Sequence, residues 1–219
     1  MFHGAKFQFG VAEISQLPPD RGREVAFAGR SNAGKSSALN ALANRRRLAF
    51  VSKTPGRTQQ LNYYALGHDR YLVDLPGYGY ARVPEAIQRR WEHMLTTYLQ
   101  HRNSLRGLVL IMDARRPLTP LDRQMLDWFA PTEKPVLILL SKSDKLSRQE
   151  SNKQFANVSA VLNSSYPNCG ARLFSSVTGL GVDQARHFVS GLLTAADAPD
   201  VEAPKHSGSG VKLRAPDLP

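Results

Sequence analysis

The sequence has a single cysteine, few acidic residues and no long apolar run. Its cysteine, Cys169, excludes an internal disulfide and suits a reducing compartment. No stretch approaches the roughly 18 uninterrupted apolar residues that a membrane-spanning helix needs. The N-terminal residues also lack the apolar segment and small-residue cleavage site of a secretory signal. We therefore expect a cytoplasmic, monomeric protein with no membrane partner.

Acidic residues are outnumbered, with 18 Asp and Glu against 29 Lys and Arg, which gives a formal net charge of +11. A surplus of this size bears mainly on what the surface attracts, and nucleic acid is the commonest polyanion in a cytosol. Arginine pairs such as Arg89-Arg90 and Arg115-Arg116 favour phosphate, because a guanidinium can bind two phosphate oxygens at once. The charge therefore favours an RNA partner, and a generically basic protein is the alternative.

The 219 residues are enough for one α/β domain with a sizeable core. Short apolar segments alternate with helical patterns, which predicts a mostly parallel sheet with helices on both faces. Residues 1–22 are predicted to be an N-terminal extension that packs on a domain at 23–195, and residues 196–219 a basic, disordered tail. Six strands are expected, at 24–29, 61–66, 70–75, 106–112, 135–140 and 171–175. Helices are expected at about 35–43, 84–102, 119–129, 147–163 and 181–193.

A phosphate-binding motif follows the first expected strand. Residues 29–36 read Gly-Arg-Ser-Asn-Ala-Gly-Lys-Ser and match the pattern G-x-x-x-x-G-K-[ST]. The glycines let backbone N–H groups turn toward phosphate oxygens, Lys35 reaches the β- and γ-phosphates, and the Ser36 hydroxyl ligates Mg²⁺. A helix that begins at about Lys35 adds its dipole to anion binding. The predicted phosphate contacts are Gly29, Arg30, Ser31, Asn32, Ala33, Gly34, Lys35, Ser36 and Ser37.

Two further segments are predicted to complete the magnesium site. Asp74-Leu75-Pro76-Gly77 ends an expected strand, so the Asp74 carboxylate can hold Mg²⁺ through a water and the Gly77 N–H can sense a γ-phosphate. The expected exposed loop at 44–58 contains Thr54-Pro55-Gly56-Arg57-Thr58. One of its threonines should complete the Mg²⁺ shell, and Thr58, just before the next strand, is the better candidate. The predicted nucleotide contacts here are Gly56, Arg57, Thr58, Asp74, Leu75, Pro76 and Gly77.

Two loops after later strands indicate which base is bound. Ser141-Lys142-Ser143-Asp144 is similar to the N/T-K-x-D guanine signature, with serine in the first position. One carboxylate that accepts from both N1–H and the exocyclic amine of guanine rejects adenine, which lacks this pair of donors. Ser175-Ser176-Val177 fits a loop whose backbone N–H meets guanine O6. Because ligands of open α/β sheets bind at the carboxyl ends of strands, all four loops are expected to meet there.

These segments resemble the TRAFAC class of GTPases and, more narrowly, the EngB family of bacterial ribosome-assembly GTPases. The resemblance covers about residues 5–195 and rests on residues 16–20, 24–37, 52–58, 74–80 and 141–144. It implies a three-layer Ras-like P-loop GTPase fold and binding of GTP or GDP with Mg²⁺. It also implies a role in assembling the large ribosomal subunit, with rRNA as a partner, and a requirement in normal cell division and septation.

The expected chemistry is slow hydrolysis of GTP. Tyr78 follows the glycine of Asp74–Gly77, where Ras-type proteins place a glutamine that orients water, and tyrosine has no amide to offer. In related potassium-activated GTPases an asparagine at the position of Asn32 helps to bind K⁺, so K⁺ is a candidate cofactor. Lys35, Thr58 and Asn32 are therefore the predicted catalytic residues. The run at 78–82 either contributes to a ribosome-facing surface in the GTP state or packs beneath the next helix.

Two other functions stay open from the sequence. A P-loop ATPase or small-molecule kinase would share the phosphate loop, and residues 141–144 argue against it. A non-catalytic GTP-binding adaptor in septation would share all four loops and would differ only in releasing no phosphate.

Overall fold

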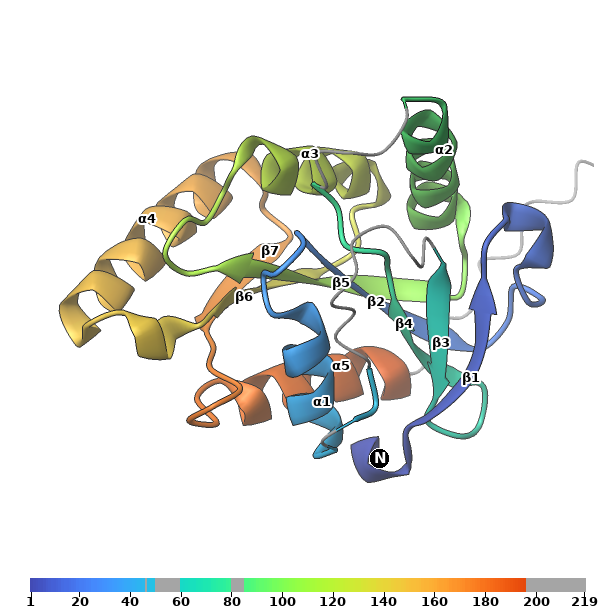
Figure 1. Cartoon of the computed structure of the whole chain (residues 1–219), viewed down its shortest axis with the longest axis horizontal. Coiled ribbons are helices and arrows are strands. Elements are labelled where there is room, and N and C mark those ends of the chain that lie inside the picture. The colour runs from blue at the N-terminus through green and yellow to red at the C-terminus, as the bar shows by residue number, and fades with distance from the viewer. Residues whose placement is uncertain (46, 50–59, 80–84, 196–219) are drawn as a thin grey trace, which may run out of the picture.

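The computed structural model describes residues 1–45, 47–49, 60–79 and 85–195, with the backbone alone for residues 85–88. Within these ranges a seven-stranded sheet runs through the centre, in the order β1-β3-β4-β2-β5-β6-β7 (Figure 1). Strand β2 pairs in parallel with β4 and β5, and β6 pairs in parallel with β5 and β7, whereas β3 is antiparallel to both of its neighbours. The strands are β1 (Lys6–Val11), β2 (Arg23–Gly29), β3 (Leu61–Ala65), β4 (Arg70–Asp74), β5 (Leu105–Asp113), β6 (Val136–Ser141) and β7 (Cys169–Leu173).

Helices cover the sheet on both faces (Figure 1). Thr119 and Ser147 cap the third and fourth helices by accepting from the backbone three residues on, which explains where these helices begin. None of the described helices is both long and apolar enough to cross a membrane. The α-helices are α1 (Lys35–Ala43), α2 (Glu85–His101), α3 (Pro120–Phe129), α4 (Arg148–Ser165) and α5 (Val182–Thr194).

Alternation along the strands divides the core into two layers. In β2, Val25 and Phe27 pack on the side of α1 and α5, whereas Ala26 and Ala28 pack on the side of α2, α3 and α4. All six residues of β6 are buried, as expected of a strand covered on both faces. The loops that follow the carboxyl ends of the parallel strands therefore start from one edge of a well-packed sheet.

The structure corrects the number of strands. The prediction of six strands is wrong because residues 6–11 form a seventh, β1, which pairs with β3. Phe9 stacks on Tyr63 with ring centroids 4.8 Å apart, and three of the six residues of β1 are exposed at the sheet edge. The segment reads Lys-Phe-Gln-Phe-Gly-Val, so the alternation typical of a strand was present in the sequence and was overlooked. The predicted tail at 196–219 and most of the predicted loop at 44–58 lie outside the described residues.

Candidate functional site

The carboxyl edge of the sheet brings together the predicted nucleotide loops. Residues 29–36 (the phosphate loop) follow β2, residues 74–77 end β4, residues 141–144 (the guanine loop) end β6, and residues 175–177 follow β7. Their common edge follows from the parallel pairing of these strands through β5. The remaining predicted contacts, Gly56, Arg57 and Thr58, lie outside the described residues, as does Thr54.

The backbone of the phosphate loop is held by turns that need unusual dihedral angles. Gly34 has φ of 102° and Asn32 has φ of 62°, both in the left-handed region. Glycine adopts this conformation without penalty, and asparagine tolerates it better than most residues. Ala33 N–H donates to Arg30 O and Ser31 N–H donates to Tyr78 O, each at 2.9 Å. Asn32 therefore shapes the loop through its own backbone, and α1 begins directly after Gly34.

Lys35 and Asp74 form an ion pair between the phosphate loop and the end of β4. Both side chains are nearly buried, with 11% and 9% of their surface exposed. Burial raises the pKa of Asp74, and the charge of Lys35 offsets part of that rise. A Cβ placed on Gly77 would lie 3.6 Å from Ser31 Cα, so the Gly77 backbone lies against the phosphate loop. Lys35, Asp74 and Gly77 are thus grouped as the sequence predicts.

Two side chains connect the guanine loop to the phosphate loop. The Ser141 hydroxyl donates to the carbonyl of Ala33, so serine in this first position does make a bridging hydrogen bond. Lys142 has φ of 57°, and its ammonium donates to Asn32 O at 2.6 Å and to Asp113 Oδ2 at 3.0 Å. The two loops therefore form one connected unit.

Asp144 is oriented by the loop that follows β7. Ser175 Oγ donates to Asp144 Oδ1 at 2.7 Å and accepts from the N–H groups of Val177 and Thr178, each at 3.2 Å. This hydrogen bond from Ser175 holds the pKa of Asp144 below its usual value, so the carboxylate stays charged near neutral pH. Ser175 itself is fully buried, whereas Ser176 is exposed. The serine of this loop thus positions the carboxylate that is predicted to select the base.

Sequence reasoning missed the partners at the end of β5. Asp113 pairs with Arg115 and with Lys142, and hydrogen bonds from Arg115 hold the pKa of the Asp113 carboxyl well below its usual range. The predicted strand stops at residue 112, whereas β5 includes Asp113, which is in register with Ser141 of β6. The sequence did hold one indication of this contact, namely a carboxylate, Asp113, directly after the apolar run of a central strand.

Tyr78 is buried, with 5% of its surface exposed, and its hydroxyl donates to Asp122 Oδ1 of α3 at 3.0 Å. Burial raises the pKa of Tyr78 well above its usual value. This side chain is therefore packed against α3. The hypothesis that the run contributes to a ribosome-facing surface in the GTP state stays a prediction. The rest of that run, from residue 80 to residue 82, lies outside the described residues.

The donor set fits a magnesium nucleotide. Ser36, in the first turn of α1, and Asp74 offer hard oxygen ligands, and Mg²⁺ in proteins typically takes one or two such ligands plus phosphate oxygens. In the described part of the chain there is no cluster of three or more His, Cys, Asp or Glu residues that could hold a metal alone. These residues thus suit a metal that arrives with its nucleotide.

Known proteins match this chain closely. Residues 24–142 match the family described as "50S ribosome-binding GTPase". The "Probable GTP-binding protein EngB" of Methylobacillus flagellatus is 54% identical over 93% of this chain and 99% of its own length. The EngB of Thiobacillus denitrificans is 57% identical over 86% of this chain and 91% of its own.

The fold matches as well. A solved structure of a probable GTP-binding protein engB has a TM-score of 0.60 at 19% identity, over 78% of this chain and 98% of that chain, and it supports the Ras-like P-loop fold. The match to the family and the high identity of the relatives agree with the loops at the carboxyl edge of the sheet. The chain therefore belongs to the EngB family of GTP-binding proteins and is a P-loop GTPase.

Proposed function

We propose that this GTPase is a Mg²⁺-dependent nucleotide switch that hydrolyses GTP slowly and acts in the cytoplasm in assembly of the large ribosomal subunit. Normal cell division and septation would depend on it through that role. The observation that carries the switch is the direct linkage of the nucleotide loops, in which Lys35 contacts Asp74 and Ser141 contacts Ala33. A change at the phosphates can thereby reach the end of β4 and the segment after it.

The residues of the site would divide the work as follows. Lys35 would neutralise phosphate charge, and Ser36 and Asp74 would hold Mg²⁺, Asp74 through a water; Thr58 is the predicted further ligand. GTP with Mg²⁺ would supply the phosphoryl group and a cation that offsets its charge. Asp144, held by Ser175, would accept from guanine, and Lys142 would lie across the base. These contacts mainly position and stabilise charge, which is what phosphoryl transfer requires.

Slow turnover would follow from Tyr78, whose hydroxyl is bonded to Asp122. A partner or a cation would then have to stabilise the transferring phosphate. For K⁺ the candidate ligand is Asn32, and rates of phosphate release in K⁺ and in Na⁺ at equal ionic strength test this. We expect faster release in K⁺, and equal rates would remove Asn32 from the catalytic residues.

The ribosomal role is supported by the description of the matching family as ribosome-binding and by the net charge of +11. Cosedimentation with isolated large and small subunits, with GTP, with GDP and without nucleotide, tests it across salt concentrations. We expect the GTP form to pellet with large subunits more than the other two forms do. The variant Asp144→Asn serves as the control that should lose the response to GTP. Identical pelleting in all three states would contradict the proposed switch.

A further inference from the structure

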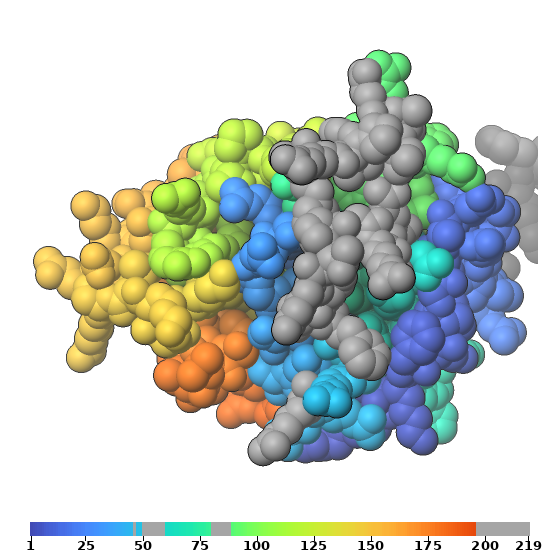
Figure 2. All heavy atoms as spheres, in the orientation of Figure 1, coloured from blue at the N-terminus to red at the C-terminus, as the bar shows by residue number. Residues whose placement is uncertain are grey.

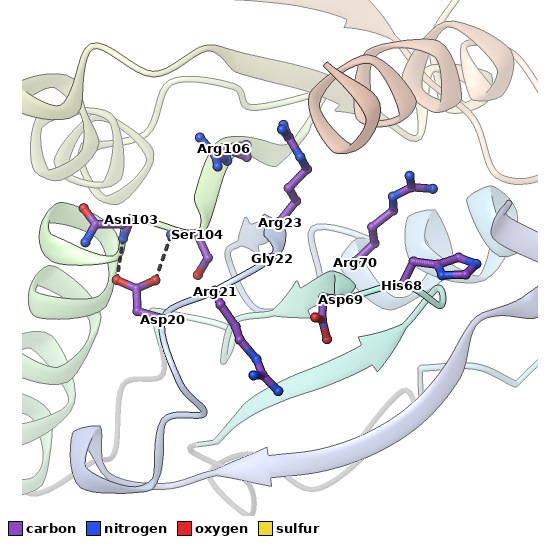
Figure 3. A pocket seen from close by; sticks show the side chains of 10 residues that line it. All are labelled: Asp20, Arg21, Gly22, Arg23, His68, Asp69, Arg70, Asn103, Ser104 and Arg106. Atoms are coloured by element: carbon purple, nitrogen blue, oxygen red, sulfur yellow. Dashed lines mark hydrogen bonds between the residues drawn. The ribbon is translucent and has the colours of Figure 1, made fainter. Parts of the chain in front are cut away.

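A basic pocket lies at the opposite edge of the sheet from the nucleotide loops. It has a volume of about 280 Å³ and is formed where β2, β4 and β5 begin (Figure 3). Its lining is entirely polar apart from one glycine. The lining residues are Asp20, Arg21, Gly22, Arg23, His68, Asp69, Arg70, Asn103, Ser104 and Arg106.

Sheet register concentrates positive charge in this pocket. Arg23 of β2 and Arg70 of β4 are direct partners in the parallel pairing, so their side chains leave the same face of adjacent strands. Arg106, from β5, lines the same pocket (Figure 3). Arg23 also donates to the carbonyl of Leu192 in the last turn of α5, at 3.4 Å, which helps to hold its guanidinium in place. Like charges side by side on a sheet repel each other, so an anion bound between them would relieve that repulsion.

The carboxylates of the pocket leave a positive surplus. Four arginines face two aspartates among the lining residues. Of the two aspartates, Asp20 accepts from the N–H groups of Asn103 and Ser104, each at 2.8 Å (Figure 3). It also lies 3.4 Å from Arg102 Nε.

We propose that this pocket binds the phosphate backbone of an RNA strand. Arginine binds phosphate through paired hydrogen bonds, and backbone contacts need no base-reading or apolar groups. The volume is just below the range of about 300–1,000 Å³ typical of whole small-molecule ligands, which suits part of a strand better. Among the described residues no apolar side chain lines the pocket, so it offers no apolar surface to a peptide side chain or a lipid.

In the proposed ribosomal role, this pocket would be an RNA-binding site separate from the nucleotide-dependent surface. The inference rests on the proposed function only for the identity of the RNA. Its described walls include none of the nucleotide loops. Binding here is therefore expected to be the same with GTP, with GDP and without nucleotide. This separates it from the switch, whose ribosome binding is expected to depend on GTP.

The test uses the full chain and a fluorescently labelled single-stranded oligouridylate of about 16 nucleotides, a length that spans a typical single-strand site. Fluorescence anisotropy gives the affinity at several salt concentrations for the wild type, Arg70→Gln and Arg23→Gln/Arg70→Gln. Each phosphate contact that is lost should reduce the slope of log K against log salt by about 0.7. We expect a reduction of about 0.7 for the single variant and about 1.4 for the double variant, with unchanged GDP binding.

The matched control is Arg123→Gln/Lys153→Gln, which removes two exposed charges from α3 and α4. It should bind RNA with the wild-type slope. Equal losses in the control and the double variant would mean general charge attraction and would overturn the pocket. Wild-type RNA binding by Arg70→Gln and the double variant would also overturn it, as would Arg70-dependent binding of inorganic triphosphate alone. If ribosome pelleting did not depend on GTP but the salt slopes changed as expected, the proposed switch would be refuted and the proposed RNA pocket would still be supported.

Discussion

Replacing Ser141 with alanine tests whether the bridge between the guanine loop and the phosphate loop holds the nucleotide site in shape. The Ser141 hydroxyl donates to the carbonyl of Ala33, and these residues are 3% and 4% exposed. A buried carbonyl that loses its donor costs about 1–3 kcal/mol, more than the net value of the bond itself. We expect the free energy of unfolding to fall by about 1–3 kcal/mol. GDP affinity should fall by up to about tenfold, as the loops lose their fixed relation.

Urea unfolding measures the first quantity, and isothermal titration calorimetry with GDP measures the second. Ser104→Ala is the matched control, because Ser104 is 2% exposed and its hydroxyl donates to Glu24 Oε1 at 3.0 Å, at the opposite edge of the sheet from the nucleotide loops. Ser141→Thr keeps a hydroxyl and should restore most of the GDP affinity. Equal GDP affinities in the two alanine variants would refute the reasoning, as would a threonine variant as weak as Ser141→Ala.

Three further predictions concern charge and burial around the site. Asp144→Asn should lower GTP affinity by at least about tenfold, since a hydrogen bond to a charged group is worth about 1.5–3 kcal/mol, and should leave ATP affinity nearly unchanged in competition assays. In a urea titration, Tyr78→Phe should lower the free energy of unfolding by about 1.5–3 kcal/mol, because it removes a buried donor to the Asp122 carboxylate. The control Tyr166→Phe, at an exposed tyrosine–aspartate pair, should lower it by less than about 0.5 kcal/mol. Asp113 has a depressed pKa in the folded state, so its charge stabilises the fold in full above the ordinary carboxyl pKa of about 3.9. The effect starts to decline below that pH and is lost as pH falls through the depressed pKa of the folded state. The stability difference between the wild type and Asp113→Asn should therefore shrink between neutral pH and about pH 3; a constant difference would contradict the assignment.

Much of the fold follows from local pattern. The helix at 35–43 was predicted at the bounds of α1, because its apolar positions have helical spacing directly after the glycine-rich loop. Other elements were displaced by a few residues at most, as with the last strand, predicted at 171–175 and found at Cys169–Leu173. Strand β1 was missed although apolar residues alternate along residues 6–11, because its partner β3 lies about 50 residues away and the short pattern alone does not show that it joins the sheet. Local sequence therefore predicts elements well where both faces are covered.

The site could be predicted only as a set of loops. Motif spacing places Lys35, Asp74 and Asp144 at strand ends, but contacts between loops depend on strand order and register. The contact of Lys142 with Asp113 exists because β5 and β6 are neighbours with Asp113 opposite Ser141. The register of β5 against β6 cannot be read from the sequence, because a complete helix, α3, separates the two strands along the chain.

The same parallel strands explain why the chain can carry two anion sites at once. Strand β2 begins at Arg23 and ends at Gly29, and β4 begins at Arg70 and ends at Asp74. Six residue steps at about 3.3 Å each separate Arg23 from Gly29 by about 20 Å. The phosphates bound in the basic pocket would therefore be too far away to touch a nucleotide at the phosphate loop. Its contribution would be to anchor the protein, while any response to GTP would have to arise at the carboxyl edge, where Lys35 meets Asp74.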